Sequence, residues 1–145
     1  MSWFNLFGLI FMVVILIPNI IFGIMHPEVF ENKYSSKTVE ALEQVGRFCC
    51  FGFMFISPPF VCLGYPFDGA QTVYIILGAA LTALYTIGWA VFWHESSVRK
   101  ALALSILPSL LFLESGILTL HIPLIIFSVI FAICHITISY KNAVL

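Results

Sequence analysis

Six side chains that could bind a ligand lie within or beside otherwise apolar stretches of this chain. They are an amide, a guanidinium, two imidazoles, a carboxyl and an indole: Asn19, Arg47, His121, His135, Glu114 and Trp89. Polar and ionisable groups are costly inside a membrane and often mark a solute or proton pathway, so each is a candidate ligand-binding residue. Their spacing matches no metal site or catalytic dyad, and we predict no catalytic residue, metal or cofactor.

Three of the candidates are predicted to lie at one depth. Asn19 follows Pro18, which kinks a helix by removing a backbone hydrogen bond. His135 lies near the end of the last apolar stretch, and Arg47 borders the second. All three fall within about 10 Å of one membrane surface by helix rise. We expect Asn19 and His135 to line a shared cavity that Arg47 closes. The alternative is that both merely hydrogen-bond to neighbouring helices, each bond contributing about 1 kcal/mol.

The other candidates have different surroundings. Glu114 lies about 20 Å from the inner edge of its stretch and is expected in a separate outer site for a proton or cation. The alternative is a solvated carboxylate at a helix end. His121 follows across the Ser115-Gly116 turn. Trp89 belongs to an aromatic row that is more typical of packing than of ligand binding.

The elements that position these residues are apolar helices. Hydrophobic residues make up 61% of the 145-residue chain and charged residues 9%, whereas soluble domains are about one quarter charged. A spanning helix needs about 20 apolar residues. The sequence therefore predicts one all-α transmembrane domain, a polytopic helix bundle over 1–145. Its five spans are 3–25, 48–64 with a helical lead-in from 38, 71–93, 101–119 and 122–140. The alternative is four spans, with 101–140 forming one broken or re-entrant element.

Basic residues predict the orientation of the bundle. With five spans, all six Lys and Arg residues fall on one face, and basic residues favour the cytoplasmic side. The N-terminus is therefore expected outside and the C-terminus in the cytoplasm. We expect lipid as the surroundings, a second copy or another membrane protein as a partner, and no nucleic acid.

Two helix faces carry further predictions. Gly78, Thr82, Thr86 and Ala90 recur every four residues and predict a small-residue stripe on which another helix packs closely. Glu43 precedes Arg47 by one turn, which favours a salt bridge at the membrane surface. The functional alternative is a site for an anion or lipid headgroup at Arg47.

Three short motifs carry a resemblance to a group of proteins. They are Glu43-Gln44-x-Gly46-Arg47, Ile-Pro18-Asn19-Ile in the first stretch, and Ser115-Gly116 before the last. In these the chain resembles uncharacterised small multi-span inner-membrane proteins of Gram-positive bacteria. The resemblance implies a bacterial inner membrane and no particular activity.

These observations favour a non-enzymatic membrane protein that binds or moves a small solute, or that serves as a membrane-embedded partner subunit. Helices broken by proline, with buried Asn, Glu and His, are what a solute pathway uses. One alternative is an intramembrane enzyme that acts on a lipid-like substrate through His135, Glu114 or His121. Another is a structural or regulatory protein without a ligand.

Overall fold

The computed structural model describes residues 3–25, 37–94 and 97–144, and they form an all-α bundle. Its five helices are α1 (Leu6–Met25), α2 (Lys37–Phe55), α3 (Ala70–Val91), α4 (Val98–Leu118) and α5 (Ile122–Val144). Four of them, α1, α3, α4 and α5, are long and apolar enough to cross a membrane. The prediction of a polytopic helical membrane protein is confirmed at this level.

The predicted second span is where the structure differs most from the sequence prediction. A span over 48–64 was expected, but α2 ends at Phe55, before Ser57-Pro58-Pro59. Proline lacks a backbone N–H, and it also disfavours helical geometry in the residue before it. The helix begins at Lys37, close to the predicted lead-in from residue 38, so its first half carries charged side chains. Only four helices, and not the predicted five, therefore meet the length and composition of a span.

The four-span alternative agrees with the number of candidate spans in the structure, but it placed the broken element in the wrong segment. Residues 101–140 are not one broken element but most of two long helices, α4 and α5, joined by a tight turn. Pro108 lies buried inside α4 without ending it. Ser hydroxyls on α4 donate to carbonyl oxygens one turn back, among them Ser109 to the Ser105 carbonyl at 2.8 Å. Such bonds help to satisfy the backbone around a proline in a spanning helix.

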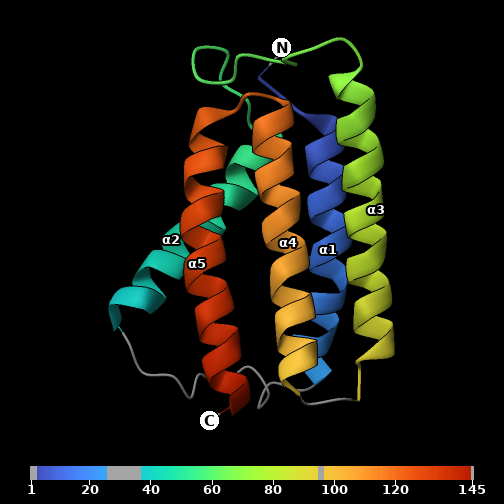
Figure 1. The fold of residues 1–145 in the computed structure, drawn as a ribbon, viewed down its shortest axis with the longest axis vertical. Helices are drawn as coiled ribbons and strands as arrows, with labels where there is room; N and C mark the ends of the chain where they lie inside the picture. The colour runs from blue at the N-terminus through green and yellow to red at the C-terminus, as the bar shows by residue number, and fades with distance from the viewer. Residues whose placement is uncertain (1–2, 26–36, 95–96, 145) are drawn as a thin grey trace.

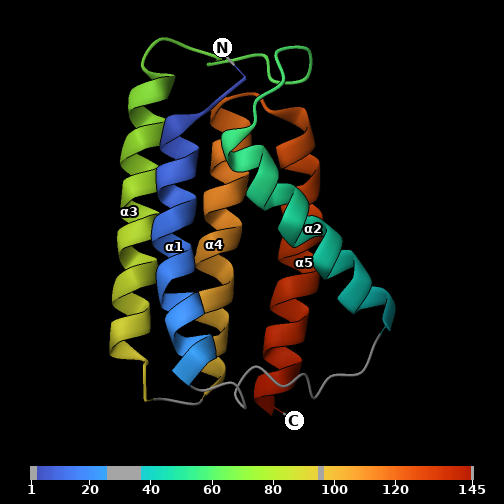
Figure 2. The same ribbon diagram turned by 180° about the vertical axis from the view of Figure 1, so that it is seen from behind.

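The helices alternate in direction. Figures 1 and 2 show α1, α3, α4 and α5 running roughly along the long axis, while α2 crosses obliquely against α5. In Figure 1, α1, α3 and α5 run downward and α2 and α4 run upward. Lys37, Arg99, Lys100 and Lys141 lie at helix ends that share the lower end of the bundle. Arg47 lies partway along α2, and Lys33 falls outside the described residues.

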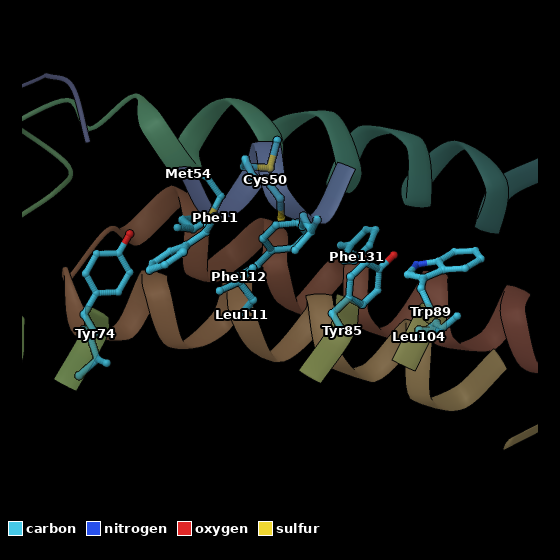
Figure 3. Close-up of a cluster of buried hydrophobic side chains, with 14 of the residues drawn as sticks. Phe11, Cys50, Met54, Tyr74, Tyr85, Trp89, Leu104, Leu111, Phe112 and Phe131 are labelled. Atoms are coloured by element: carbon cyan, nitrogen blue, oxygen red, sulfur yellow. The ribbon is translucent and has the colours of Figure 1, made fainter. Parts of the chain in front are cut away.

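Aromatic and sulfur-containing side chains fill the centre of the bundle. Figure 3 shows this core between the helices, and its labelled residues include Phe11, Met54, Tyr74 and Phe112. The helices approach closely where glycine leaves room. A Cβ built on Gly8 of α1 would lie 1.8 Å from the carbonyl oxygen of Met54 in α2. Any side chain at this position would therefore separate the two helices.

The small-residue stripe predicted on α3 is only half correct. Gly78 and Thr82 are buried, and a Cβ on Gly78 would lie 2.3 Å from the Phe11 ring of α1. Thr86 and Ala90 are exposed, and the buried face continues through Tyr85 and Trp89. A row with a four-residue step drifts around a helix that has 3.6 residues per turn. The stripe therefore leaves the packed face after two members.

Candidate functional site

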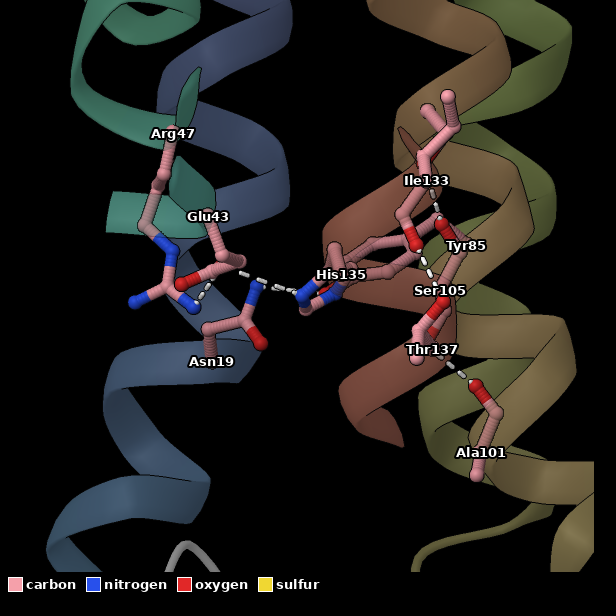
Figure 4. A network of polar contacts seen from close by, with 10 residues as sticks. Asn19, Glu43, Arg47, Tyr85, Ala101, Ser105, Ile133, His135 and Thr137 are labelled. Carbon is pink, nitrogen blue, oxygen red and sulfur yellow. Dashed lines mark hydrogen bonds and ion pairs between the residues drawn. The ribbon is translucent and has the colours of Figure 1, made fainter. Parts of the chain in front are cut away.

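Glu43 lies at the centre of a polar cluster between α2 and α5. Its side chain is 3% exposed, and a single carboxylate oxygen, Oε1, contacts two cationic or titratable groups. Arg47, one turn further along α2, forms an ion pair with Oε1 through Nη2. His135 of α5 places Nδ1 3.3 Å from the same oxygen. Figure 4 shows these contacts. The structure thus brings together Arg47 and His135, which the sequence predicted at one depth.

The same contacts favour the ionised form of Glu43. Burial alone would raise the pKa of its carboxyl group. The hydrogen bond from His135 and the positive charge of Arg47 outweigh that effect, and the pKa of Glu43 lies below its ordinary value. The cluster therefore holds a buried carboxylate and not a neutral acid.

Glu43 was predicted beside Arg47 but not as a member of the site. The buried residues of α2 are Glu43, Gly46, Cys50 and Met54, which recur at helical spacing on one face. A glutamate on the face that otherwise buries small and apolar side chains is a signal of a polar contact in the interior. That signal was available in the sequence.

Asn19 belongs to a neighbouring contact between α1 and α3. Its Nδ2 donates to the Tyr85 hydroxyl at 2.6 Å and to the carbonyl oxygen of Ile15 at 2.9 Å. Arg47 interacts electrostatically with the same Tyr85 hydroxyl, which links the two groups of contacts. The hydrogen bond to Tyr85 is the kind of interhelical contact that the packing alternative describes. Tyr85 was not predicted as a partner of Asn19.

A cavity shared by Asn19 and His135 stays a prediction. Two cavities in the described part of the chain, of about 540 and 290 Å³, are lined by other residues. The larger lies among the start of α1, the loop after α2 and the start of α3. The smaller lies between α3 and α4. Within the described residues, no group of three or more His, Cys, Asp and Glu side chains could hold a metal ion.

His121 is held by backbone groups at the opposite end of the bundle. Its Nε2 lies 2.9 Å from the carbonyl oxygen of Ile56, which only accepts, so Nε2 carries the proton. The backbone N–H of Leu124 donates to Nδ1 at 3.3 Å. Burial lowers the pKa of His121, although the bond to the Ile56 carbonyl acts in the opposite direction. The neutral ring therefore connects the end of α2 to the start of α5, and both of its nitrogens are used.

Glu114 and Trp89 lie apart from the polar cluster. Glu114 is on α4 and lines the smaller cavity. Trp89 is buried and packs on Phe22, with ring centroids 4.7 Å apart. The ammonium of Lys100 lies 4.4 Å from the centroid of the Phe22 ring and 5.3 Å from that of Trp89. Trp89 thus belongs to an aromatic group that surrounds a cation of the chain itself.

The fold defines the class of protein: a small all-helical protein with four candidate membrane spans. The chain matches no protein-family model, no curated protein and no solved structure.

Proposed function

We propose that this chain is a multi-pass membrane protein that binds or moves a small solute, and that the Glu43–Arg47–His135 cluster is its binding site. The main support for this proposal is the burial of the Glu43 side chain, which is 3% exposed and contacts side chains from two helices, α2 and α5. Buried ionisable groups that pair with one another are typical of substrate and ion pathways in membrane proteins.

Arg47 is the group that would contact the solute. Its side chain is 34% exposed, and its ion pair with Glu43 uses Nη2. A guanidinium presents five N–H donors, so several remain to bind a phosphate or carboxylate. The solute we propose is therefore an anion or an anionic lipid headgroup.

The same proposal includes an orientation. The end of the bundle that carries Lys37, Arg99, Lys100 and Lys141 faces the cytoplasm of a bacterial cell, as basic residues favour. The alternating helix directions support an N-terminus outside and a C-terminus inside. In this arrangement α2 returns the chain across the membrane although its first half is charged. The cluster then binds a solute from the cytoplasmic side.

Mass spectrometry of the protein purified in a mild detergent tests this proposal. We expect an anionic small molecule or lipid to co-purify with the parent, and its mass distinguishes the two sources. Arg47→Gln should reduce its occupancy at least tenfold. Lys141→Gln, which removes an exposed charge at the same end, should leave occupancy unchanged. An anion retained equally by Arg47→Gln, or lost equally in Lys141→Gln, would overturn the proposal.

A further inference from the structure

The larger of the two cavities lies near the end of the bundle opposite the Glu43 cluster. Its volume is about 540 Å³, and it lies where the start of α1, the loop after α2 and the start of α3 meet, at the upper end of Figure 1. That volume falls within the range of cavities that hold small ligands. Polar and apolar groups share its lining, which includes Phe4, Phe7, Asn5, Tyr65 and Gln71. None of these residues belongs to the Glu43 cluster.

The side-chain amide of Asn5 is held in place by two hydrogen bonds. Its Oδ1 accepts from the backbone N–H of Gly8 at 3.1 Å, in the first turn of α1. Its Nδ2 donates to the hydroxyl of Tyr74, a fully buried residue of α3, at 3.1 Å. An amide nitrogen carries two protons, and the bond to Tyr74 uses one. Asn5 therefore offers the cavity a donor whose position is fixed by two helices.

A second amide and a phenol line the same cavity. Gln71 lies in the first turn of α3, and its side chain is hydrogen-bonded to that of Tyr65 in the preceding loop. Burial raises the pKa of the Tyr65 hydroxyl, although the bond to Gln71 acts in the opposite direction. The hydroxyl is therefore neutral and can both donate and accept. Both residues are exposed, so a ligand can reach them from outside the bundle.

The lining indicates the chemistry of the ligand. Among the described residues that line the cavity, none is charged, so a charged ligand would find no partner of opposite sign there. Amides and phenols both donate and accept, which suits neutral hydroxyl groups. Phe4, Phe7 and the ring of Tyr65 add apolar surface. A sugar ring combines the two matching properties, because its hydroxyls lie around its edge and its C–H groups form apolar faces.

The cavity also borders the surface that faces lipid. Leu6 and Leu63, which line it, are 55% and 68% exposed, and Ile10 continues this exposed apolar surface along α1. Because α1 is a candidate span, its first turn lies near a membrane interface. A sugar in the cavity can therefore be the headgroup of a lipid whose acyl chains lie along α1.

We propose that this cavity binds an uncharged sugar, either as a lipid headgroup or free in solution. The sugar hydroxyls hydrogen-bond to Asn5, Tyr65 and Gln71, and a C–H face of the ring lies against the aromatic side chains. This site is independent of the proposed anion site, because it lies near the other end of the bundle and selects a neutral ligand.

Native mass spectrometry with three lipids of identical acyl chains tests the proposal. Glucosyl diacylglycerol carries a sugar, diacylglycerol lacks a headgroup, and phosphatidylglycerol carries an anionic headgroup. We expect the protein to retain one glucosyl diacylglycerol at least tenfold more tightly than diacylglycerol. Competition with methyl glucoside distinguishes the two sources of sugar. Displacement of the lipid would show that the cavity accepts a free sugar, and retention would show that it needs the lipid-borne one.

Two variants at exposed positions test whether the cavity is the site. Gln71→Leu and Tyr65→Leu should each weaken retention of glucosyl diacylglycerol at least tenfold. Asn5 is kept, because it also caps α1. Gln44→Leu on α2 and Phe67→Leu in the same loop as Tyr65 are the matched controls, since both residues are exposed and lie outside the lining. Both controls should retain the lipid as the parent does.

Three results would overturn the proposal. Unchanged retention in either Gln71→Leu or Tyr65→Leu would show that the sugar does not bind in the cavity. Equal retention of glucosyl diacylglycerol and diacylglycerol would show that only acyl chains are bound. Phosphatidylglycerol can also bind at Arg47, so only the part of its retention that Gln71→Leu removes reports on the cavity. Tighter retention of phosphatidylglycerol than of the glucosyl lipid, abolished by Gln71→Leu, would assign the cavity to an anion.

Discussion

Gly46 of α2 lies directly against the backbone of Phe131 in α5. A Cβ built on Gly46 would lie 3.0 Å from the Phe131 nitrogen. Glu43 is three residues before Gly46, and His135 is four residues after Phe131, so both polar groups lie about one turn from this contact. The close approach of the two helices thus allows Nδ1 of His135 to reach the Glu43 carboxylate at 3.3 Å.

Gly46→Leu should therefore separate α2 from α5. Overpacking at a helix contact costs about 1–3 kcal/mol, and we expect the free energy of unfolding to fall by that amount. Thermal or denaturant unfolding in detergent measures it. Gly52→Leu on the same helix is the matched control, because a Cβ there has no neighbour within 4 Å. Equal stability of the two variants would show that the Gly46 contact does not hold the helices together.

The Glu43 carboxylate should make stability depend on pH. Its pKa is lower in the folded protein than the ordinary value of 4.5, so the unfolded chain takes up its proton first as pH falls. The stabilisation is complete above about 4.5 and is lost as pH falls through that value and below it. Below about pH 4.5, unfolding of Glu43→Gln should therefore take up as much as one proton fewer than unfolding of the parent, and its unfolding free energy should depend less steeply on pH. Asp68→Asn is the control, because it removes an exposed acid in the loop between α2 and α3. It should keep the steeper pH dependence of the parent.

The Asn19–Tyr85 hydrogen bond should contribute to stability. Interhelical hydrogen bonds in membranes contribute about 1 kcal/mol, and we expect that loss in Asn19→Leu and in Tyr85→Phe. In the double variant the two losses should not add, because both remove one contact. Additive losses would show that the contact contributes nothing. If Asn19 also belongs to the solute site, Asn19→Leu lowers anion occupancy whereas Tyr85→Phe lowers stability alone.

Reporters that work on one side of the membrane test the orientation. We expect a reporter at the N-terminus to be active outside and one at the C-terminus to be active in the cytoplasm, since α1, α3 and α5 run in one direction. A reporter inserted beside Asp68, in the loop between α2 and α3, should be active outside. Activity of that loop reporter in the cytoplasm would mean that α2 does not return the chain across the membrane.

The amino-acid sequence determined the helical class of this protein and the depth of its polar residues. Helix length and hydropathy are local properties, so α1, α3, α4 and α5 follow from their own composition. Depth follows from the rise per residue, which places Asn19 and His135 near one end and Glu114 near the other. The sequence also predicted that basic residues gather at one end of the bundle, and they lie near the ends of α2, α4 and α5.

Tertiary structure alone decided which residues at one depth meet. His135 reaches Glu43 because Gly46 lets α2 approach α5, whereas Asn19 turns to Tyr85 on α3. The tilt of α2, and with it the burial of Glu43, depends on packing against α5, whose Phe131 lies 85 residues after Gly46 in the chain. Depth is a property of one helix, but lateral neighbours depend on how all the helices rotate and cross, and no local pattern encodes that arrangement.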